Sequence, residues 1–297
     1  MRCLLLCCLL LCGFVQGQTL PDKFKQLSYA TSWQKVAAIQ LNFSAYHPQG
    51  MVKIDNYFFL SSVEVTQAPR NGSSGEGIGH LFKLDSTGKL ISSINLGEGA
   101  VYHPGGIDYD GESIWIPVAE YRPDSKSIIY KVNPNTLAIK EIMRYPEHIG
   151  GIVHNTEAHK LLGISWGSRN FYQWPVNSKD KASNTEVPPD KLRIPNPSFY
   201  IDYQDCHYVG QQMMLCSGLQ KYSNGTQIIR LGGIDLISLK DYRPIHQVPI
   251  RLWSPTGLPM TNNPFWLEST AKGIRTYFIP DDDKAATLFI YEAVLEP

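Results

Sequence analysis

Three segments of this sequence open with a histidine and run through glycine into an apolar residue. They are His47-Pro48-Gln49-Gly50-Met51, His103-Pro104-Gly105-Gly106-Ile107 and His148-Ile149-Gly150-Gly151-Ile152. An imidazole can bind a transition metal, exchange a proton near neutral pH, or form hydrogen bonds with a polar ligand. Because the segments align without gaps, an internal repeat could bring the three rings to one place.

Two less similar units extend this repeat and open at Asp202 and Asn263. Each of the five openings is followed by a strand-like run, a tight turn and a second strand-like run. The openings lie 45 to 61 residues apart. That period suits a four-stranded propeller blade with some long loops.

The rest of the chain has the pattern of an all-β protein. Short β-branched and aromatic runs, such as residues 57–60, 113–116, 127–130 and 287–291, are separated by Gly, Asn, Asp and Pro turns. The last unit is one strand short, and residues 33–41 read as a strand that could complete it and remove an open sheet edge. We therefore expect a single β-propeller of five four-stranded blades closed by an N-terminal strand. The alternative is a β-sandwich in which the repeated openings are coincidental.

The first strand of each propeller blade lies nearest the axis, so the five openings should converge around one channel. Glu64, Glu120 and Ser165 stand at the same offset after their own histidines, where the second strand returns to that end. A concave polar mouth of this kind suits a small molecule or a glycan. The candidate ligand-binding residues are His47, Gln49, Glu64, His103, Glu120, Arg122, His148, Ser165, Trp166, Arg169, Asp202 and Asn263.

Three interpretations of the opening residues remain open. His47, His103, His148 and Asp202 could bind a divalent transition metal such as zinc, iron or manganese, with the glutamates orienting the rings. They could instead bind an organic ligand, or each could cap a turn and contact a neighbouring blade. The turn Asp281-Asp282-Asp283-Lys284 is expected to be a polar turn, with calcium binding as its alternative.

The sequence does not decide between a binding protein and an enzyme. The first hypothesis is a secreted protein that recognises a small molecule or glycan in the extracellular space or matrix. The second is a propeller enzyme, either a metal-dependent hydrolase or lyase or a glutaminyl cyclotransferase. No nucleophile elbow, phosphate loop or HExxH helix is present, so no catalytic residue is assigned.

The N-terminus predicts secretion. Residues 1–17 form an apolar run ending in small residues, typical of a signal peptide cleaved after Gly17, and residues 18–297 form the mature propeller domain. Asn42, Asn71 and Asn224 begin N-glycosylation triplets. Cys206 and Cys216 are the cysteines left after cleavage, and in an oxidising compartment they are expected to form a disulfide.

Charge sets limits on the partners. The chain contains 27 Lys plus Arg and 27 Asp plus Glu, so its bulk charge provides no field to attract nucleic acid or anionic lipid. No stretch after the leader has the ~20 apolar residues of a spanning helix. We expect a monomer with neither nucleic acid nor membrane as partner.

Several motifs carry a family resemblance. The stretches starting at His103 (HPGGID), Val118 (VAEYRP), His148 (HIGGIVH), Ser165 (SWGSR) and Tyr203 (YQDC) resemble a domain family of unknown function. That resemblance implies a propeller-like fold and no assigned activity. Gln49-Gly50 and Glu64 are also similar to the opening of plant-type glutaminyl cyclotransferases, which are secreted five-bladed propellers.

Overall fold

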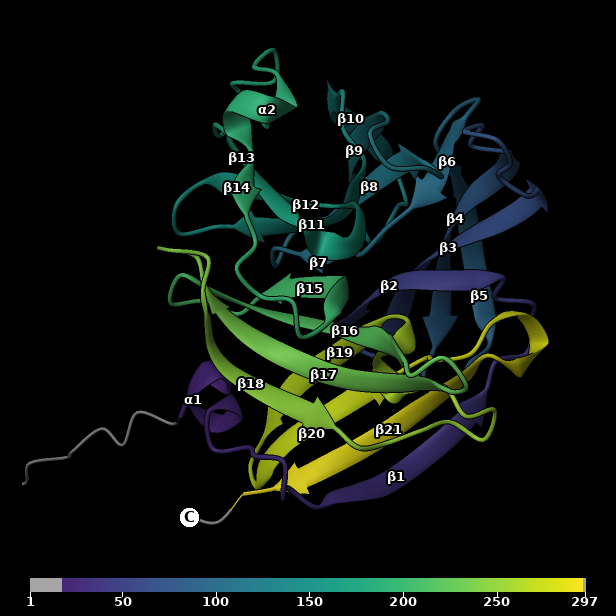
Figure 1. Ribbon diagram of the computed structural model, residues 1–297, viewed down its shortest axis with the longest axis vertical. Helices are drawn as coiled ribbons and strands as arrows, with labels where there is room; N and C mark the ends of the chain where they lie inside the picture. The colour runs from purple at the N-terminus through teal and green to yellow at the C-terminus, as the bar shows by residue number, and fades with distance from the viewer. Residues whose placement is uncertain (1–17, 296–297) are drawn as a thin grey trace, which may run out of the picture.

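The computed structural model describes residues 18–295 and shows the expected five antiparallel sheets around a common centre (Figure 1). Strands β2, β7, β11, β15 and β19 lie nearest that centre, and β1, β10, β14 and β18 lie toward the outside. The all-β propeller prediction is confirmed, and the sandwich alternative is wrong. The predicted signal peptide lies outside the described residues.

Each blade follows the predicted order of strands from the centre outward. Blade 1 contains β2 (His47–Ile54), β3 (Tyr57–Gln67), β4 (Glu76–Asp85) and β5 (Leu90–Leu96). Blade 2 differs from the predicted four strands because its inner strand is divided into β6 (Val101–Pro104) and β7 (Asp108–Tyr109), which both pair with β8 (Ile114–Glu120). Strands β9 (Ser127–Val132) and β10 (Ile139–Tyr145) complete it. Blade 3 contains β11 (Ile149–Asn155), β12 (Lys160–Ser165), β13 (Asn170–Pro175) and β14 (Ile194–Pro195). Blade 4 contains β15 (Asp202–Tyr208), β16 (Met213–Ser223), β17 (Ile228–Ser238) and β18 (Pro244–Ile250).

Blade 5 joins the two ends of the chain. It contains β19 (Phe265–Thr270), β20 (Gly273–Phe278), β21 (Thr287–Val294) and the N-terminal β1 (Trp33–Gln40). Strand β1 pairs antiparallel with β21, with Trp33 opposite Ala293 and Gln40 opposite Thr287. The predicted closure is confirmed, and it gives the edge of β21 a hydrogen-bonded neighbour.

The helices are short. They are α1 (Leu20–Phe24), α2 (Pro189–Leu192) and the 3-10 turns η1 (Trp166–Ser168), η2 (Met260–Asn262) and η3 (Asp283–Ala285). Within residues 18–295, no helix has the length and apolar character needed to cross a membrane.

The repeated glycines let the inner strands meet at the centre. A Cβ on Gly50 would lie 2.5 Å from the Ile107 amide nitrogen, and one on Gly106 would lie 2.9 Å from Asp205 Oδ1. Without side chains here, neighbouring blades bond directly, as in the 2.9 Å hydrogen bond from Gly106 N to Gly150 O. The repeat motif therefore has a packing origin as well as a role in placing the histidines.

One carboxylate occupies the space that the glycines leave. Asp205, on β15, is 1% exposed and accepts hydrogen bonds from the backbone amides of Met51 (2.9 Å), Ile107 (3.0 Å) and Phe265 (3.4 Å). These amides belong to blades 1, 2 and 5. A single side chain of blade 4 thus ties four blades together at the axis.

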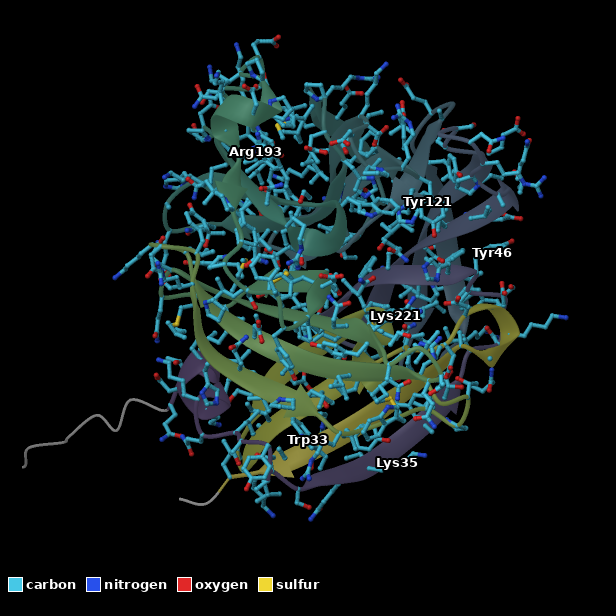
Figure 2. The ribbon with its side chains drawn as sticks, in the orientation of Figure 1. Trp33, Lys35, Tyr46, Tyr121, Arg193 and Lys221 are labelled. Atoms are coloured by element: carbon cyan, nitrogen blue, oxygen red, sulfur yellow. A yellow bond between two sulfur atoms is a disulfide. The ribbon has the colours of Figure 1, made fainter. Side chains whose placement is uncertain are left out.

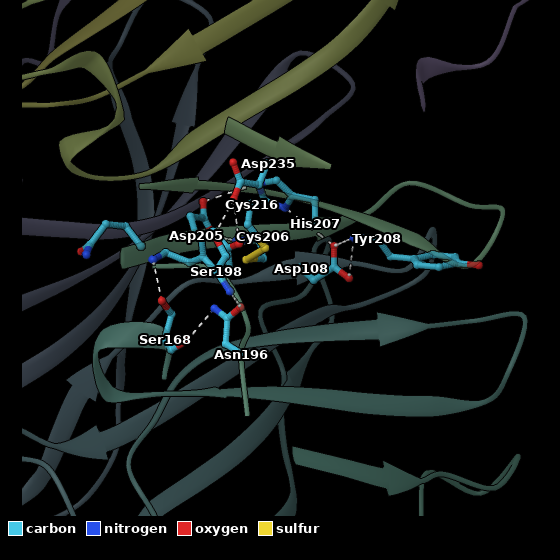
Figure 3. The surroundings of a disulfide bond; sticks show 12 residues. Asp108, Ser168, Asn196, Ser198, Asp205, Cys206, His207, Tyr208, Cys216 and Asp235 are labelled. Atoms are coloured by element: carbon cyan, nitrogen blue, oxygen red, sulfur yellow. Dashed lines mark hydrogen bonds and ion pairs between the residues drawn. A yellow bond between two sulfur atoms is a disulfide. The ribbon is translucent and has the colours of Figure 1, made fainter. Parts of the chain in front are cut away.

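A buried histidine compensates the charge of Asp205 (Figure 3). Nε2 of His207 lies 3.5 Å from Asp205, and Nδ1 lies 3.7 Å from Asp108. Burial opposes protonation of His207, but the two carboxylates outweigh it and raise the pKa of His207 to about 10. This charged cluster is structural, because it lies within the protein interior.

The predicted disulfide between Cys206 and Cys216 is confirmed. The two cysteines face each other across β15 and β16 and are buried. The bond therefore joins adjacent strands of blade 4, directly beside Asp205 (Figure 3).

Candidate functional site

A polar cavity of about 340 Å³ lies where the inner strands of blades 1 to 4 begin. Seven of the predicted site residues line it: His47, Gln49, His103, His148, Ser165, Trp166 and Asp202. Asn263 lines an adjoining cavity of about 250 Å³ together with His47 and Asp202. The repeat thus brings the five opening residues to one end of the propeller. Their role as ligand contacts remains a prediction.

His148 is a neutral ring held in one tautomer. Its Nδ1 donates to the carbonyl oxygens of Glu120 (2.9 Å) and Arg122 (3.2 Å), so Nε2 is left as an acceptor. Burial lowers the pKa of His148 to about 4 although the two carbonyls oppose that shift. The ring is therefore uncharged at neutral pH.

His103 has no hydrogen-bond partner for its ring among the described residues, and its Nδ1 is fully enclosed. The side chain is 6% exposed and lies against Tyr121, with ring centroids 4.1 Å apart. Burial, reinforced by nearby His148 and His47, holds its pKa well below the ordinary value. This neutral ring offers hydrogen-bonding capacity that no described protein group uses.

His47 is oriented by a carboxylate from the turn before β21. Its Nδ1 donates to Asp282 Oδ1 at 2.9 Å, and the Asn263 amide donates to the same oxygen at 2.9 Å. Like His148, His47 is left with Nε2 as its acceptor. Asp282 belongs to a polar turn, as expected, and its carboxylate also reaches the mouth of the propeller.

The predicted glutamates lie near the site but do not orient the three histidines. Glu64 accepts from His80 Nε2 at 3.2 Å, and Glu120 pairs with Arg122 at 2.6 Å. Each glutamate thus binds a side chain other than the three histidines. Arg169, the other predicted arginine of the site, pairs with Asp202 at 2.6 Å.

The described residues do not assemble the predicted metal set. Across residues 18–295, no group of three His, Cys, Asp or Glu side chains is placed so that it could hold a metal ion. The hydrogen bonds from Nδ1 of His47 and His148 orient the rings as such bonds do in metal sites, but no third ligand joins them among the described side chains. The described arrangement therefore offers hydrogen-bonding groups and no assembled set of metal ligands.

The model of a family of unknown function, DUF6454, matches residues 4–297. The chain belongs to this family. The resemblance carried by the repeat motifs is thereby confirmed, and it brings no activity with it. None of the curated proteins matches the sequence.

Solved structures with a similar fold have very different sequences. The tail fibre of Staphylococcus aureus phage P68 is 13% identical with a TM-score of 0.52, and the match covers 91% of this chain and 54% of that one. The chain thus spans about half the length of that protein. The likeness to the tail fibre describes the fold alone.

Two further structures are described as carbohydrate-active enzymes. A candidate glycoside hydrolase from Parabacteroides distasonis is 8% identical with a TM-score of 0.49, over 86% of this chain and 88% of that one. A candidate glycosidase from Bacteroides thetaiotaomicron is 8% identical with a TM-score of 0.48, over 92% and 95%.

Among the residues at this end of the propeller that sequence reasoning missed are Tyr121, Gln204, Lys221 and Asp282. The repeat itself held the signal for three of them. Lys221 and Asp282 stand nineteen positions after their unit's opening residue, and Tyr121 stands eighteen positions after His103, as Trp166 does after His148. Glu64 and Glu120 stand seventeen positions after their histidines, so a search one or two positions further along each unit would have found Tyr121, Lys221 and Asp282.

Proposed function

We propose that this protein binds a small polar molecule or a glycan in the cavity at the mouth of the propeller. The observation that carries the proposal is the unpartnered neutral ring of His103 between two other imidazoles. His47 and His148 each keep Nε2 as an acceptor because Nδ1 is already used. Acceptors gathered in one cavity suit a ligand rich in hydroxyl groups, which donate and accept hydrogen bonds.

The aromatic wall of the cavity supports the same proposal. Trp166 is 40% exposed and lies edge-on to His148, with ring centroids 4.7 Å apart. Tyr121 lies 5.9 Å from Trp166 and extends the wall toward blade 2. Such rings combine an apolar face with a polar edge, which suits a sugar ring that has both kinds of surface.

Replacing His103 with phenylalanine is expected to weaken binding of a cognate oligosaccharide by about 10- to 100-fold. The variant keeps an aromatic ring of similar shape but removes both nitrogens. The free energy of unfolding of the variant should be unchanged or rise by up to about 1 kcal/mol, because the substitution removes a buried nitrogen that has no hydrogen-bond partner. Titration calorimetry against an oligosaccharide panel, with thermal melts, measures both effects.

The control for this variant is His159→Phe, which changes an exposed histidine outside the cavity. It should leave binding unchanged. If His103→Phe binds every oligosaccharide as tightly as the parent protein does, the cavity is not the binding site.

A second candidate function, an enzyme, is favoured by the Asp282–His47 pair. A carboxylate that holds Nδ1 of a histidine leaves Nε2 as a proton acceptor, the arrangement that general-base catalysis uses. Analysis of products after incubation with the same oligosaccharides distinguishes the two functions. Turnover that disappears in His47→Gln would replace the binding assignment with an enzymatic one.

Secretion and glycosylation are part of the proposal. Asn42, Asn71 and Asn224 are all exposed, and a disulfide suits an oxidising compartment. Mass spectrometry of protein from a secretory eukaryotic host should find Gln18 as N-terminus, an intact Cys206–Cys216 bond and glycans on at least one asparagine. A retained leader with free thiols would contradict secretion.

A further inference from the structure

Three cavities adjoin one another across the mouth of the propeller. The central cavity shares His47, Asp202, Gln204 and Lys221 with the 250 Å³ cavity beside Asn263. On its other side it shares Tyr121 and Trp166 with a cavity of about 460 Å³, which also includes Arg70, Asn71 and Arg122. Together the three form one groove from the loops of blades 1 and 2 to blade 5. A groove of this kind accommodates a linear ligand of several units.

The groove is more basic than the protein as a whole. Its lining contains the cations Arg70, Arg122 and Lys221 and the acid Asp202, and Asp282 adds a second carboxylate at the mouth through its contact with His47. Arg122 is neutralised by Glu120, and Asp202 is neutralised by Arg169, each at 2.6 Å. Burial keeps the rings of His103 and His148 uncharged at neutral pH.

Two cations therefore remain without a protein counter-charge. Among the described residues, neither Arg70 nor Lys221 forms an ion pair, although the whole chain balances 27 basic against 27 acidic residues. Arg70 lines the outer cavity, whereas Lys221 lines the central cavity and the one beside Asn263. Arg70 follows β3 in blade 1, whereas Lys221, labelled in Figure 2, lies on β16 in blade 4. Separated cations of this kind favour a ligand that carries more than one negative charge.

We infer that the groove binds an acidic oligosaccharide, a linear chain of sugar residues that carry carboxylates. This inference rests on the proposed function and names its ligand class. Sugar hydroxyls satisfy the imidazole acceptors in the centre, ring faces lie against Trp166 and Tyr121, and carboxylates reach Arg70 and Lys221. An acidic peptide fits less well, because its backbone offers one N–H per residue and few donors to the three imidazoles.

The test uses the full mature protein and polyuronic-acid oligosaccharides of one to four residues, with their carboxyl-reduced counterparts. Affinity should rise by at least about tenfold from one to three residues, and carboxyl reduction should remove most of that gain. The preference for the acid should weaken as salt rises, because exposed charges are screened. Asn71→Gln protein is measured in parallel, because a glycan at Asn71 would lie against the outer cavity.

Lys221→Met and Arg70→Met should each lower affinity for the acidic trisaccharide by about three- to tenfold and leave the carboxyl-reduced form unaffected. Both changes keep an apolar stem and remove the charge. Lys240→Met, in an exposed turn of blade 4, is the matched control and should change nothing.

The outcomes separate the two levels of the proposal. If neutral and acidic oligosaccharides bind equally and His103→Phe still weakens both, the cavity binds sugar and the acidic class is wrong. If one residue binds as tightly as three, the extended groove is wrong. If a polyglutamate peptide binds and no sugar does, the sugar assignment is overturned together with the proposed function.

Discussion

Replacing Asp205 with alanine is expected to destabilise the protein by about 5 kcal/mol or more, which is enough to leave much of the chain unfolded. Hydrogen bonds to a charged group contribute about 1.5 to 3 kcal/mol each. Asp205 accepts such bonds from the amides of Met51 and Ile107 at 2.9 and 3.0 Å. Its removal leaves those amides buried and unpaired and deprives His207 of its nearer carboxylate.

Two further variants make this prediction specific. Asp205→Asn keeps one acceptor oxygen, so it should fall between Asp205→Ala and the parent protein. Asp241→Ala, at an exposed turn, should change the free energy of unfolding by less than about 0.5 kcal/mol. Urea denaturation measures all three. A melting temperature for Asp205→Ala within about 2 °C of the parent would show that the carboxylate does not hold the blades together.

The strand order, the closure by residues 33–40 and the gathering of the opening residues could all be predicted from the repeat. The reason is physical, since a Cβ at Gly50 or Gly106 would collide with the backbone of a neighbouring inner strand, and glycine recurs at this position in three units. Gly50, Gly106 and Gly151 stand three positions after their histidines. Asp205 stands three positions after Asp202 and breaks that pattern. An alignment of the repeat units shows that Asp205 replaces the glycine, but it cannot show that four blades meet at this side chain.

The hydrogen bonds of the site could not be predicted in this way. Sequence offsets place Glu120 at the same end of the propeller as the histidines, but its side chain pairs with Arg122 and only its carbonyl reaches the imidazole of His148. Asp282 reaches His47 from the far end of the chain, across 235 positions. Which acid orients which ring depends on side-chain reach across blades, and a repeat period does not contain that information.

Acid is expected to destabilise the protein through its buried neutral histidines, and His148→Asn should remove a defined part of that effect. In the native state the pKa of His148 is lowered from 6.5 to about 4. The unfolded chain therefore binds the proton more readily, so stability is full above pH 6.5 and is lost as the pH falls toward 4. This shift corresponds to about 3 kcal/mol.

The stability of the His148→Asn variant at a single pH is not informative. The shorter asparagine side chain also changes the hydrogen bond that Nδ1 of His148 donates to the carbonyl oxygen of Glu120. The informative quantity is the change in unfolding free energy between pH 7 and pH 4. Asp235 opposes the effect of His148 over part of this range, because burial raises its pKa to about 6. The stabilisation that protonated Asp235 contributes is full below its ordinary pKa of 3.8 and is lost as the pH rises through 6. Only the difference between variant and parent isolates His148.

Urea denaturation at intervals from pH 7 to pH 4 should therefore show that His148→Asn loses about 3 kcal/mol less stability than the parent protein does. His159→Asn is the matched control, since it exchanges the same residue types at an exposed position whose positive φ of 51° suits asparagine. It should follow the parent curve. Parallel curves for His148→Asn and the parent would mean that His148 binds a proton as readily in the native state as in the unfolded chain, so that burial does not lower its pKa. The ring would then be protonated below about pH 6.5, where its Nε2 has no acceptor to offer to a hydroxyl group.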